Sequence, residues 1–265
     1  MLRGFIKFPS PQRSMARKIT VRQALRRSGL FDKTYDMEQA IKAGKVTYNS
    51  KPVQGLQFHF DSKDCLFFEG TPVRLLKKQY FVLNKPFQTS CQKHESQKFV
   101  VDVLDVDPKV RNSLFPVGRL DVPTTGLLII TNDGVLSKEL LDPKSKIAKT
   151  YKVMLKRKLS DEAIKKLEYG VVIEVQGKDY TTLPCEIKRI PGTQSDCFIT
   201  ITEGKHRQIR KMFKGVDNAV MNLSRTAIGG LTLEEIGLTE GNYKEITFDE
   251  LTQKIKKKVK VKSSK

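Results

Sequence analysis

The stretch that most constrains the fold covers residues 118–134, where a polar segment that contains an acid leads directly into a continuous apolar run. Residues 123–126, Pro-Thr-Thr-Gly, are turn formers. Residues 127–130 are all apolar, which is typical of a short strand that is covered on both faces. Residues 132–134, Asn-Asp-Gly, predict a turn or a helix cap. The pattern places Asp121 in a turn at the edge of a hydrophobic core, where a rigidly held carboxylate can serve as a nucleophile.

The chain is strongly basic, and its charges are clustered. It carries 49 Lys and Arg against 29 Asp and Glu, a formal net charge of +20 over 265 residues. The first 31 residues hold eight basic residues and no acid, and the last 15 hold seven lysines and no acid. This clustering favours a polyanionic partner, with nucleic acid ahead of an anionic membrane surface. The length predicts one large or two modest domains.

Several classes of protein are excluded by what the sequence lacks. No apolar run approaches the roughly 20 residues that span a bilayer, so we expect no membrane association. The cysteines form no CxxC pair and no zinc-ligand spacing, and the three histidines are far apart, so we expect no metal site. Scattered thiols of this kind are typical of an intracellular, cytoplasmic protein. The four cysteines are Cys65, Cys91, Cys185 and Cys197.

The two termini are expected to lie outside the folded domains. Residues 1–14 are basic, lack an acid and show little amphipathic pattern, which favours a flexible basic arm. An organelle-targeting segment remains an alternative for these residues. Residues 252–265 are rich in lysine and of low complexity, and they predict a basic disordered tail.

Residues 15–73 predict a small basic module. Residues 17–28 are expected to form an amphipathic helix, and a second helix is expected to end at Gly44. A hairpin that begins at Lys45 and turns at Asn49 follows. The basic residues of the first helix recur at every fourth position: Lys18, Arg22 and Arg26. We expect this stripe and Lys45 to contact RNA phosphates, because such contacts need clustered cations rather than one exact residue.

Residues 79–251 predict a second and larger domain of the α+β class, because strands and helices interleave there without a βαβ repeat. A strand is expected at residues 80–83 and another at residues 149–158. Ser160 is expected to open a helix that Gly170 ends.

Several segments of this larger domain together resemble the motifs of the pseudouridine synthases, above all the RsuA/RluB-like branch that modifies single uridines in ribosomal RNA. Residues 118–121 resemble the GRLD motif, and residues 203–213, Glu-Gly-Lys-His-Arg-Gln-Ile-Arg-Lys-Met-Phe, resemble the EGK-x-RQ signature. Weaker matches are the Asn-Lys-Pro element at 84–86, the K-x-Y element at 149–151 and the closing segment at 222–233. The motifs occur in the order that the family has.

The first module is similar to the alpha-L (S-four-like) RNA-binding module that precedes the catalytic domain in this branch. The match is partial. The family's second helix opens with a Ser-Arg pair, whereas residues 31–36 here read Phe-Asp-Lys-Thr-Tyr-Asp. In the hairpin, Ser50 stands where the family has a glycine. The resemblance implies a pseudouridine synthase-like catalytic domain with a mostly antiparallel sheet.

The resemblance also implies the chemistry. Uridine becomes pseudouridine when the bond from the sugar to N1 breaks and the base is rejoined through C5, which needs no cofactor. Asp121 would be the catalytic carboxylate, attacking C6 of uracil or the anomeric carbon, or assisting elimination at the sugar. Tyr151 would stack on the flipped uracil, and Arg210 would pair with Asp121. The implied RNA contacts are Arg119, Lys205, Arg207 and Lys211.

We therefore expect a site-specific synthase that acts on ribosomal RNA or a pre-ribosomal particle, as a monomer without a small-molecule cofactor. A non-catalytic RNA-binding or ribosome-assembly factor with the same fold is one alternative. A synthase directed at tRNA is the other.

Overall fold

The computed structural model describes residues 18–257. The arm expected at residues 1–14 and the part of the expected tail beyond residue 257 lie outside the described residues. In the first module the elements are β1 (Lys18–Thr20), α1 (Val21–Ser28), α2 (Thr34–Lys42), β2 (Val46–Tyr48), β3 (Lys51–Pro52), β4 (His59–Asp61), β5 (Leu66–Phe68) and β6 (Thr71–Pro72).

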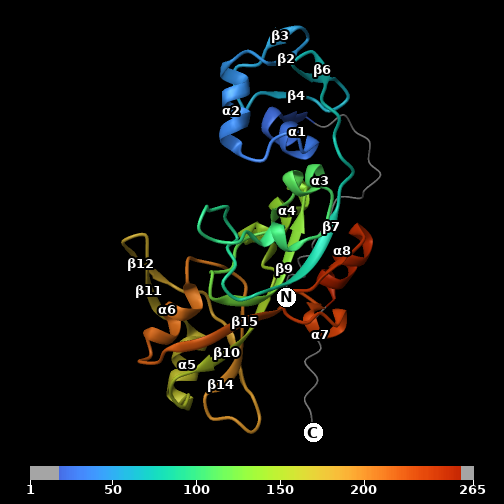
Figure 1. Ribbon diagram of the computed structural model, residues 1–265. Coiled ribbons are helices and arrows are strands. Elements are labelled where there is room, and N and C mark those ends of the chain that lie inside the picture. Colours follow the sequence, from blue (N-terminus) through green and yellow to red (C-terminus); the bar gives the residue numbers. More distant parts are fainter. Residues whose placement is uncertain (1–17, 258–265) are drawn as a thin grey trace.

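The larger domain begins with β7 and ends with α8 (Figure 1). Its elements are β7 (Tyr80–Lys85), η1 (Val100–Val103), α3 (Pro108–Ser113), β8 (Phe115–Pro116), β9 (Thr124–Thr131), α4 (Gly134–Leu141), η2 (Pro143–Ser145), β10 (Lys149–Leu155), α5 (Asp161–Tyr169), β11 (Val172–Val175), β12 (Lys178–Thr181), β13 (Glu186–Arg189), β14 (Asp196–Ile201), α6 (Gln208–Lys214), β15 (Val220–Ile228), β16 (Leu231–Thr232), α7 (Leu233–Ile236), β17 (Tyr243–Glu245) and α8 (Phe248–Lys256).

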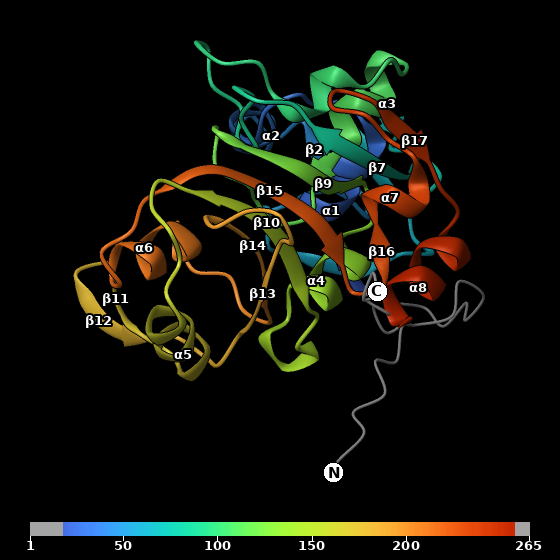
Figure 2. The same cartoon turned by 90° about the horizontal axis from the view of Figure 1, so that it is seen from below.

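A nine-stranded sheet forms the centre of the larger domain, in the order β13-β14-β10-β15-β9-β7-β17, with β16 added to β15 and β8 added to β9. Within residues 18–257, each neighbouring pair of this sheet is antiparallel except β15 and β9, which are parallel. This confirms the expected α+β class and the mostly antiparallel sheet. Figure 2 shows β15 between β10 and β9, where it joins the two halves of the sheet.

A glycine makes the parallel contact possible. Gly126 lies opposite Arg225 in the register of β9 and β15. Its φ is 105°, and a Cβ atom at this position would lie 2.3 Å from the carbonyl oxygen of Arg225. Any side chain here would force the two strands apart.

The apolar run at residues 127–130 is a strand covered on both faces, as predicted. Leu128 and Ile130 belong to the core on one face of the sheet. Leu127 and Ile129 belong to the core on the other face, with the buried side chains of α4 and α8. The alternation follows from the two-residue period of a strand.

Several expected boundaries were wrong. The strand expected at residues 149–158 ends at Leu155, and the strand expected at residues 80–83 extends to Lys85. Residues Thr124–Gly126 were expected in a turn but begin β9, because they pair with β15. Lys18 was expected on a helix but lies in β1, because Thr20 caps α1 with a capping box. The tail was expected to start at residue 252, but α8 continues to Lys256 with Ile255 buried in the core. The other expected elements, including the helix between Ser160 and Gly170, are present.

The module expected to resemble an alpha-L domain contains two helices and short strands, which is consistent with that fold without establishing it. It caps the end of the larger domain that carries α3 (Figure 1). At Gly29 the backbone approaches α3 so closely that a Cβ atom would lie 1.9 Å from the carbonyl oxygen of Lys109. Arg27 Nε donates to the carbonyl of Leu76 in the connecting segment at 2.9 Å, and the Leu76 amide donates back to Arg27.

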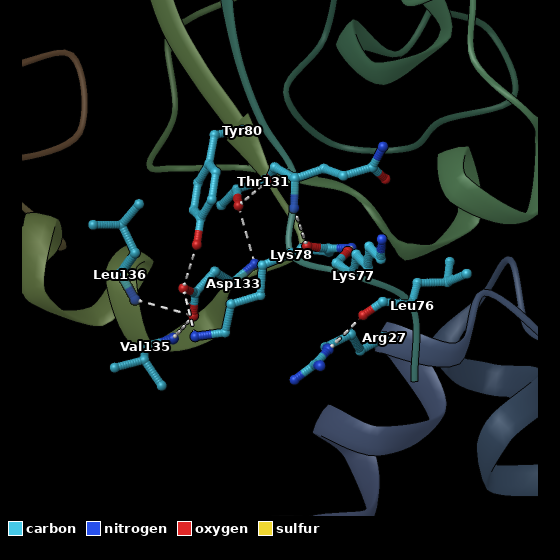
Figure 3. A network of polar contacts seen from close by, with 11 residues as sticks. Arg27, Leu76, Lys77, Lys78, Tyr80, Thr131, Asp133, Val135 and Leu136 are labelled. Carbon is cyan, nitrogen blue, oxygen red and sulfur yellow. Dashed lines mark hydrogen bonds and ion pairs between the residues drawn. The ribbon is translucent and has the colours of Figure 1, made fainter. Parts of the chain in front are cut away.

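The connecting segment is fixed on its other side by Asp133, as Figure 3 shows. Asp133 is buried and caps α4 by accepting from the amides of Val135 and Leu136. Its carboxylate also accepts from the Tyr80 hydroxyl at 3.0 Å and pairs with Lys78 Nζ at 2.9 Å. One side chain therefore joins the helix, the strand β7 and the connecting segment.

None of the helices in residues 18–257 combines the length and the apolar character that a bilayer-spanning helix needs.

Replacing Asp133 by Ala should lower the free energy of unfolding by about 3 kcal/mol, because it removes a helix cap and leaves the Tyr80 hydroxyl unpaired. Asp107 offers a matched control, since it caps α3 through the same kind of amide bonds but is exposed. Asp107→Ala should cost about 1 kcal/mol. Urea denaturation of both variants measures the difference, and equal losses would contradict the bridging role of Asp133.

Candidate active site

Asp121 lies in the loop between β8 and β9, immediately before the parallel contact of the two sheet halves. Leu120 is buried in the core, whereas Asp121 is half-buried and Arg119 is exposed. The amide of Thr124 donates to the carbonyl of Asp121 at 2.9 Å and closes a tight turn. The side chain of Asp121 is thus presented at the surface of a loop whose neighbour is anchored in the core.

The side chain of Lys85 holds this loop in place. It is the last residue of β7, and its side chain is fully buried. Its ammonium donates to three backbone carbonyls, those of Pro86 at 3.0 Å, Val122 at 3.1 Å and Thr124 at 2.8 Å. Burial lowers the pKa of Lys85 to about 8, although Cys91, Glu240 and Asp121 nearby act in the opposite direction. All three N–H donors of the ammonium are used to fix the backbone around Asp121.

Cys91 is a second contact that holds the same loop. Its sulfur accepts a hydrogen bond from the Leu120 amide at 3.3 Å. Burial raises the pKa of the Cys91 thiol, so the sulfur is held in its neutral form at neutral pH. Lys85 therefore fixes the residue after Asp121, and Cys91 fixes the residue before it. A carboxylate with both neighbours fixed is preorganised for chemistry.

Tyr151 lies in the same row of the sheet as the parallel contact. It is opposite Arg225 on β15, and Arg225 is opposite Gly126 on β9. Two strand spacings put Tyr151 about 10 Å from Gly126 across the sheet. Tyr151 is 8% exposed and packs into the same core as Leu120. The elements that carry the expected aspartate and tyrosine are therefore brought together by β15.

Arg225 supports this row from within. It is buried, and its Nε donates to the carbonyl of Leu127 at 2.7 Å. Its Nη2 atom is buried without a hydrogen-bond partner in the described chain. Close by, burial lowers the pKa of Lys149, and the charge of Arg225 adds to that effect. The charge of Glu203 acts in the opposite direction, so Lys149 lies between a cation and an anion.

Arg210 does not form the ion pair with Asp121 that the sequence predicted. No nitrogen of Arg210 lies within 4 Å of that carboxylate in residues 18–257, because Nη1 donates instead to the carbonyl of Val220 at 2.9 Å. Burial lowers the pKa of Arg210, and the charge of Asp121 opposes this shift, so the two groups interact through space. Nε and Nη2 of Arg210 are buried and have no partner in the described chain. Two strong donors near Asp121 are therefore left without a partner in the described chain.

The start of α6 depends on Glu203. Its carboxylate accepts from the Tyr180 hydroxyl at 2.5 Å, the Leu183 amide at 2.8 Å and Gln208 Nε2 at 2.7 Å. The hydrogen bond to Glu203 raises the pKa of Tyr180 to about 12. Lys205 lies 4.5 Å from the centroid of the Tyr180 ring. The acid and the amide of the EGK-x-RQ segment thus fix the helix that carries Arg210 to the hairpin β11–β12.

The expected RNA-binding residues divide into two groups. Within the described chain, the side chains of one group are exposed and make no hydrogen bond or ion pair: Lys18, Arg22, Arg119 and Arg207. Those of the other group are already partnered by the protein: Arg26 with Thr34, Lys45 with Glu69, Lys205 with Tyr180 and Lys211 with the carbonyl of Glu174. The first group presents cations to solvent, where phosphate can reach them.

Across residues 18–257, no three His, Cys, Asp or Glu side chains lie close enough together to hold a metal ion. The free donors at this site are guanidinium groups, which suit an anion or a polar base rather than a cation.

Residues 79–214 match the family model described as RNA pseudouridylate synthase. A Bacillus subtilis relative, the uncharacterised RNA pseudouridine synthase YtzG, is 38% identical over 82% of this chain and 90% of its own length. The chain belongs to the RNA pseudouridine synthases. It falls in the RsuA/RluB branch, as the motifs indicated.

Two further relatives carry names that state a target. The ribosomal small subunit pseudouridine synthase A of Vibrio cholerae is 33% identical over 80% of this chain and 90% of its own length. The ribosomal large subunit pseudouridine synthase B of Bacillus subtilis is 34% identical over 81% of this chain and 86% of its own length. A solved pseudouridylate synthase structure aligns with a TM-score of 0.63 and 28% identity, covering 89% of this synthase and 99% of that chain.

Sequence reasoning assigned no role to three residues that shape this synthase's site. Lys85 stood only in a weak motif, Cys91 was one of four scattered cysteines, and Arg225 stood in the closing segment. A lysine placed between an apolar strand and a proline is a usable signal for Lys85, because such a buried ammonium needs carbonyl partners. Nothing in the sequence marks Cys91, since its role depends on an amide 29 positions away.

Replacing Lys85 by Met should lower the turnover of this synthase by about 100-fold, because the carbonyls of Val122 and Thr124 lose their donor and Asp121 moves.

The pKa of Lys85 also predicts a pH dependence of stability. In the folded protein this pKa is about 8, whereas the ordinary value for lysine is 10.5. Between these values the folded protein binds fewer protons here than the unfolded chain does. The contribution of Lys85 to the free energy of unfolding should therefore become more favourable as pH rises through that window.

Urea denaturation of the wild type and Lys85→Met at about pH 7.5 and about pH 10 measures this contribution. The free energy of unfolding of the wild type, relative to that of Lys85→Met, should be higher at the higher pH. The turnover of the wild type should fall as pH rises through about 8, because the neutral amine loses one donor. A stability difference that shifts the other way would contradict the buried, depressed ammonium.

Proposed function

We propose that this synthase converts one uridine of ribosomal RNA to pseudouridine, with Asp121 as the catalytic carboxylate. The observation that carries the proposal is the fixing of both neighbours of Asp121, by Lys85 and by Cys91. A loop held in this way is expected where a side chain must meet a reacting atom with little freedom. The names of two relatives, one for each ribosomal subunit, support ribosomal RNA as the substrate.

The reaction is an isomerisation that the side chains of the chain itself can carry. The bond from C1′ of the ribose to N1 of uracil breaks, the base turns, and C1′ bonds to C5. N1 gains a proton and C5 loses one, so no oxidant, reductant or co-substrate is consumed. Asp121 supplies the carboxylate, by attack at C6, by attack at C1′ or by assisting elimination. The uridine reaches it by flipping out of its stack.

Tyr151 and Arg210 have distinct roles in the proposal. Tyr151 supplies an aromatic face beside the row that leads to Gly126, and stacking on a base is worth ~1–3 kcal/mol. Its hydroxyl is a candidate to relay the proton that leaves C5. Arg210 has two buried donors without a partner in the described chain. These donors would bind the substrate and stabilise negative charge between themselves and Asp121 once the RNA is in place.

The exposed cations supply the general affinity for RNA. Arg119 lies two residues before Asp121, and Arg207 lies at the start of α6. On the N-terminal module, Lys18 and Arg22 are exposed to solvent. Cations that are free of protein carboxylates suit phosphate contacts, which give affinity without sequence choice. In this proposal the backbone beside the flipped uridine contacts Arg119, and the surrounding RNA contacts the N-terminal module.

Mapping of pseudouridine by carbodiimide primer extension tests the function. Ribosomal RNA is compared from cells with the wild type, with Asp121→Asn, or with neither. A single stop seen only with the wild type is the expected result. No difference on ribosomal RNA, with a new stop on tRNA, would support a tRNA-directed synthase. No stop on either RNA, with binding to ribosomal RNA retained, would support a non-catalytic assembly factor.

Arg210→Lys should reduce turnover about 10- to 100-fold while changing RNA affinity little, because a lysine keeps the charge but loses the paired donors. Release of tritium from C5-labelled uridine gives the turnover, and filter binding gives the affinity. Arg207→Gln is the matched control, which should weaken affinity more than turnover. Equal losses in both quantities for Arg210→Lys would count against its role beside Asp121.

A further inference from the structure

An unusually exposed tyrosine ends α5. Tyr169 is the last residue of this helix and is 88% exposed. Lys165 and Lys166 precede it by four and three residues, so they lie on the same side of the helix. Within the described chain neither lysine forms an ion pair, whereas Asp161 at the other end of α5 is paired with Arg189. The folded protein gains little from placing an aromatic ring and two unpaired cations here.

The ring borders a hollow of about 600 Å³. Its walls come from the end of α5, from the start of β11 and from Gly215, which follows α6. Val172 lies in the wall and is itself 59% exposed. The lining contains two lysines and no acid. We call this feature the α5–α6 hollow.

We propose that the α5–α6 hollow binds an unpaired nucleotide of the RNA substrate. Its base would stack on Tyr169, and the backbone phosphates on either side of it would contact Lys165 and Lys166. The proposal rests on the proposed function, since it supplies a second contact for the same RNA. An aromatic ring beside lysines is the arrangement that binds single strands with little sequence preference. A protein partner is disfavoured, because the apolar surface is bordered by cations without carboxylates.

The position of the hollow suits RNA that also enters the active site. α6 carries Arg210 near its start and reaches the hollow at its end, and these points are roughly 7.5 Å apart along the helix axis. Arg210 and Lys214 are four residues apart on α6 and so lie on one face of that helix. In Figure 1, α5 lies at the end of the larger domain opposite the N-terminal module. The hollow and the module would therefore hold RNA on two sides of Asp121.

The first test removes the ring. The probe is a fluorescein-labelled single-stranded RNA of about 12 nucleotides, and its binding is followed by anisotropy. Tyr169→Ala should weaken binding roughly 5- to 30-fold, and Tyr169→Phe should bind like the wild type, because stacking needs the ring and not the hydroxyl. Thermal unfolding of both variants should match the wild type, since the side chain is exposed. Unchanged binding by Tyr169→Ala, or an equal loss in Tyr169→Phe, overturns the proposal.

The second test removes the charges. The double variant Lys165→Gln/Lys166→Gln should reduce the slope of log K against log salt concentration by about 1.4, or about 0.7 for each phosphate contact on a single strand. Lys144→Gln/Lys146→Gln is the matched control, because these two exposed lysines lie on and beside η2 and removing them changes the net charge equally. Equal changes of this slope in the two double variants would show an effect of net charge alone, and they would overturn the proposed phosphate contacts of Lys165 and Lys166.

The outcomes separate this inference from the proposed function. If the wild type makes pseudouridine and Tyr169→Ala binds the probe as tightly as the wild type does, only the proposed role of the hollow is refuted. Wild-type protein that makes no pseudouridine refutes the function, and the ring then still decides whether the hollow binds single-stranded RNA.

Discussion

The close approach of two parallel strands at Gly126 is the constraint on which the rest of the site depends. It joins a four-stranded half, β13-β14-β10-β15, to the half built on β9 and β7. Here the backbone of Gly126 lies against the carbonyl of Arg225, and the Arg225 guanidinium donates to the carbonyl of Leu127, the next residue of β9. Each half carries part of the proposed site: Asp121 precedes β9, Tyr151 lies on β10, and Arg210 lies on α6 and bonds to the first residue of β15. The site exists only where the halves meet.

The site is held by buried or half-buried cations that bind backbone carbonyls rather than carboxylates. Lys85 uses three carbonyls, Arg225 uses one and Arg210 uses one. Burying such charges costs free energy, which the two hydrophobic cores on either face of the sheet offset. In return the positions of these groups are fixed before substrate arrives. The unpartnered nitrogens of Arg210 and Arg225 fit this account, because RNA can complete the hydrogen bonds that the protein leaves open.

Features set by local chemistry could be predicted from the sequence. The apolar run at 127–130, the helix from Ser160 to Gly170 and the turn at Asn49 depend on neighbours in the chain, and all are present. The larger domain's family followed from motifs whose spacing local structure preserves. Contacts between distant residues were harder. Lys85 is charged and fully buried, and Arg210 chooses the Val220 carbonyl over a direct pair with Asp121. Such choices depend on which carbonyls the fold leaves open, and a pattern of residue types does not contain them.

The parallel pair also fixes how much of the chain must be made before the elements of the proposed site can come together. Thr124 and Leu223 are partners in that pair but stand 99 positions apart in the chain. Contacts of such long range form late, because the loop between them must first close. A nascent chain that ends before β15 has Asp121 but lacks the strand that brings Tyr151 beside it. If the proposed site is correct, a chain that has not yet made β15 cannot complete it, and we expect such a chain to be inactive.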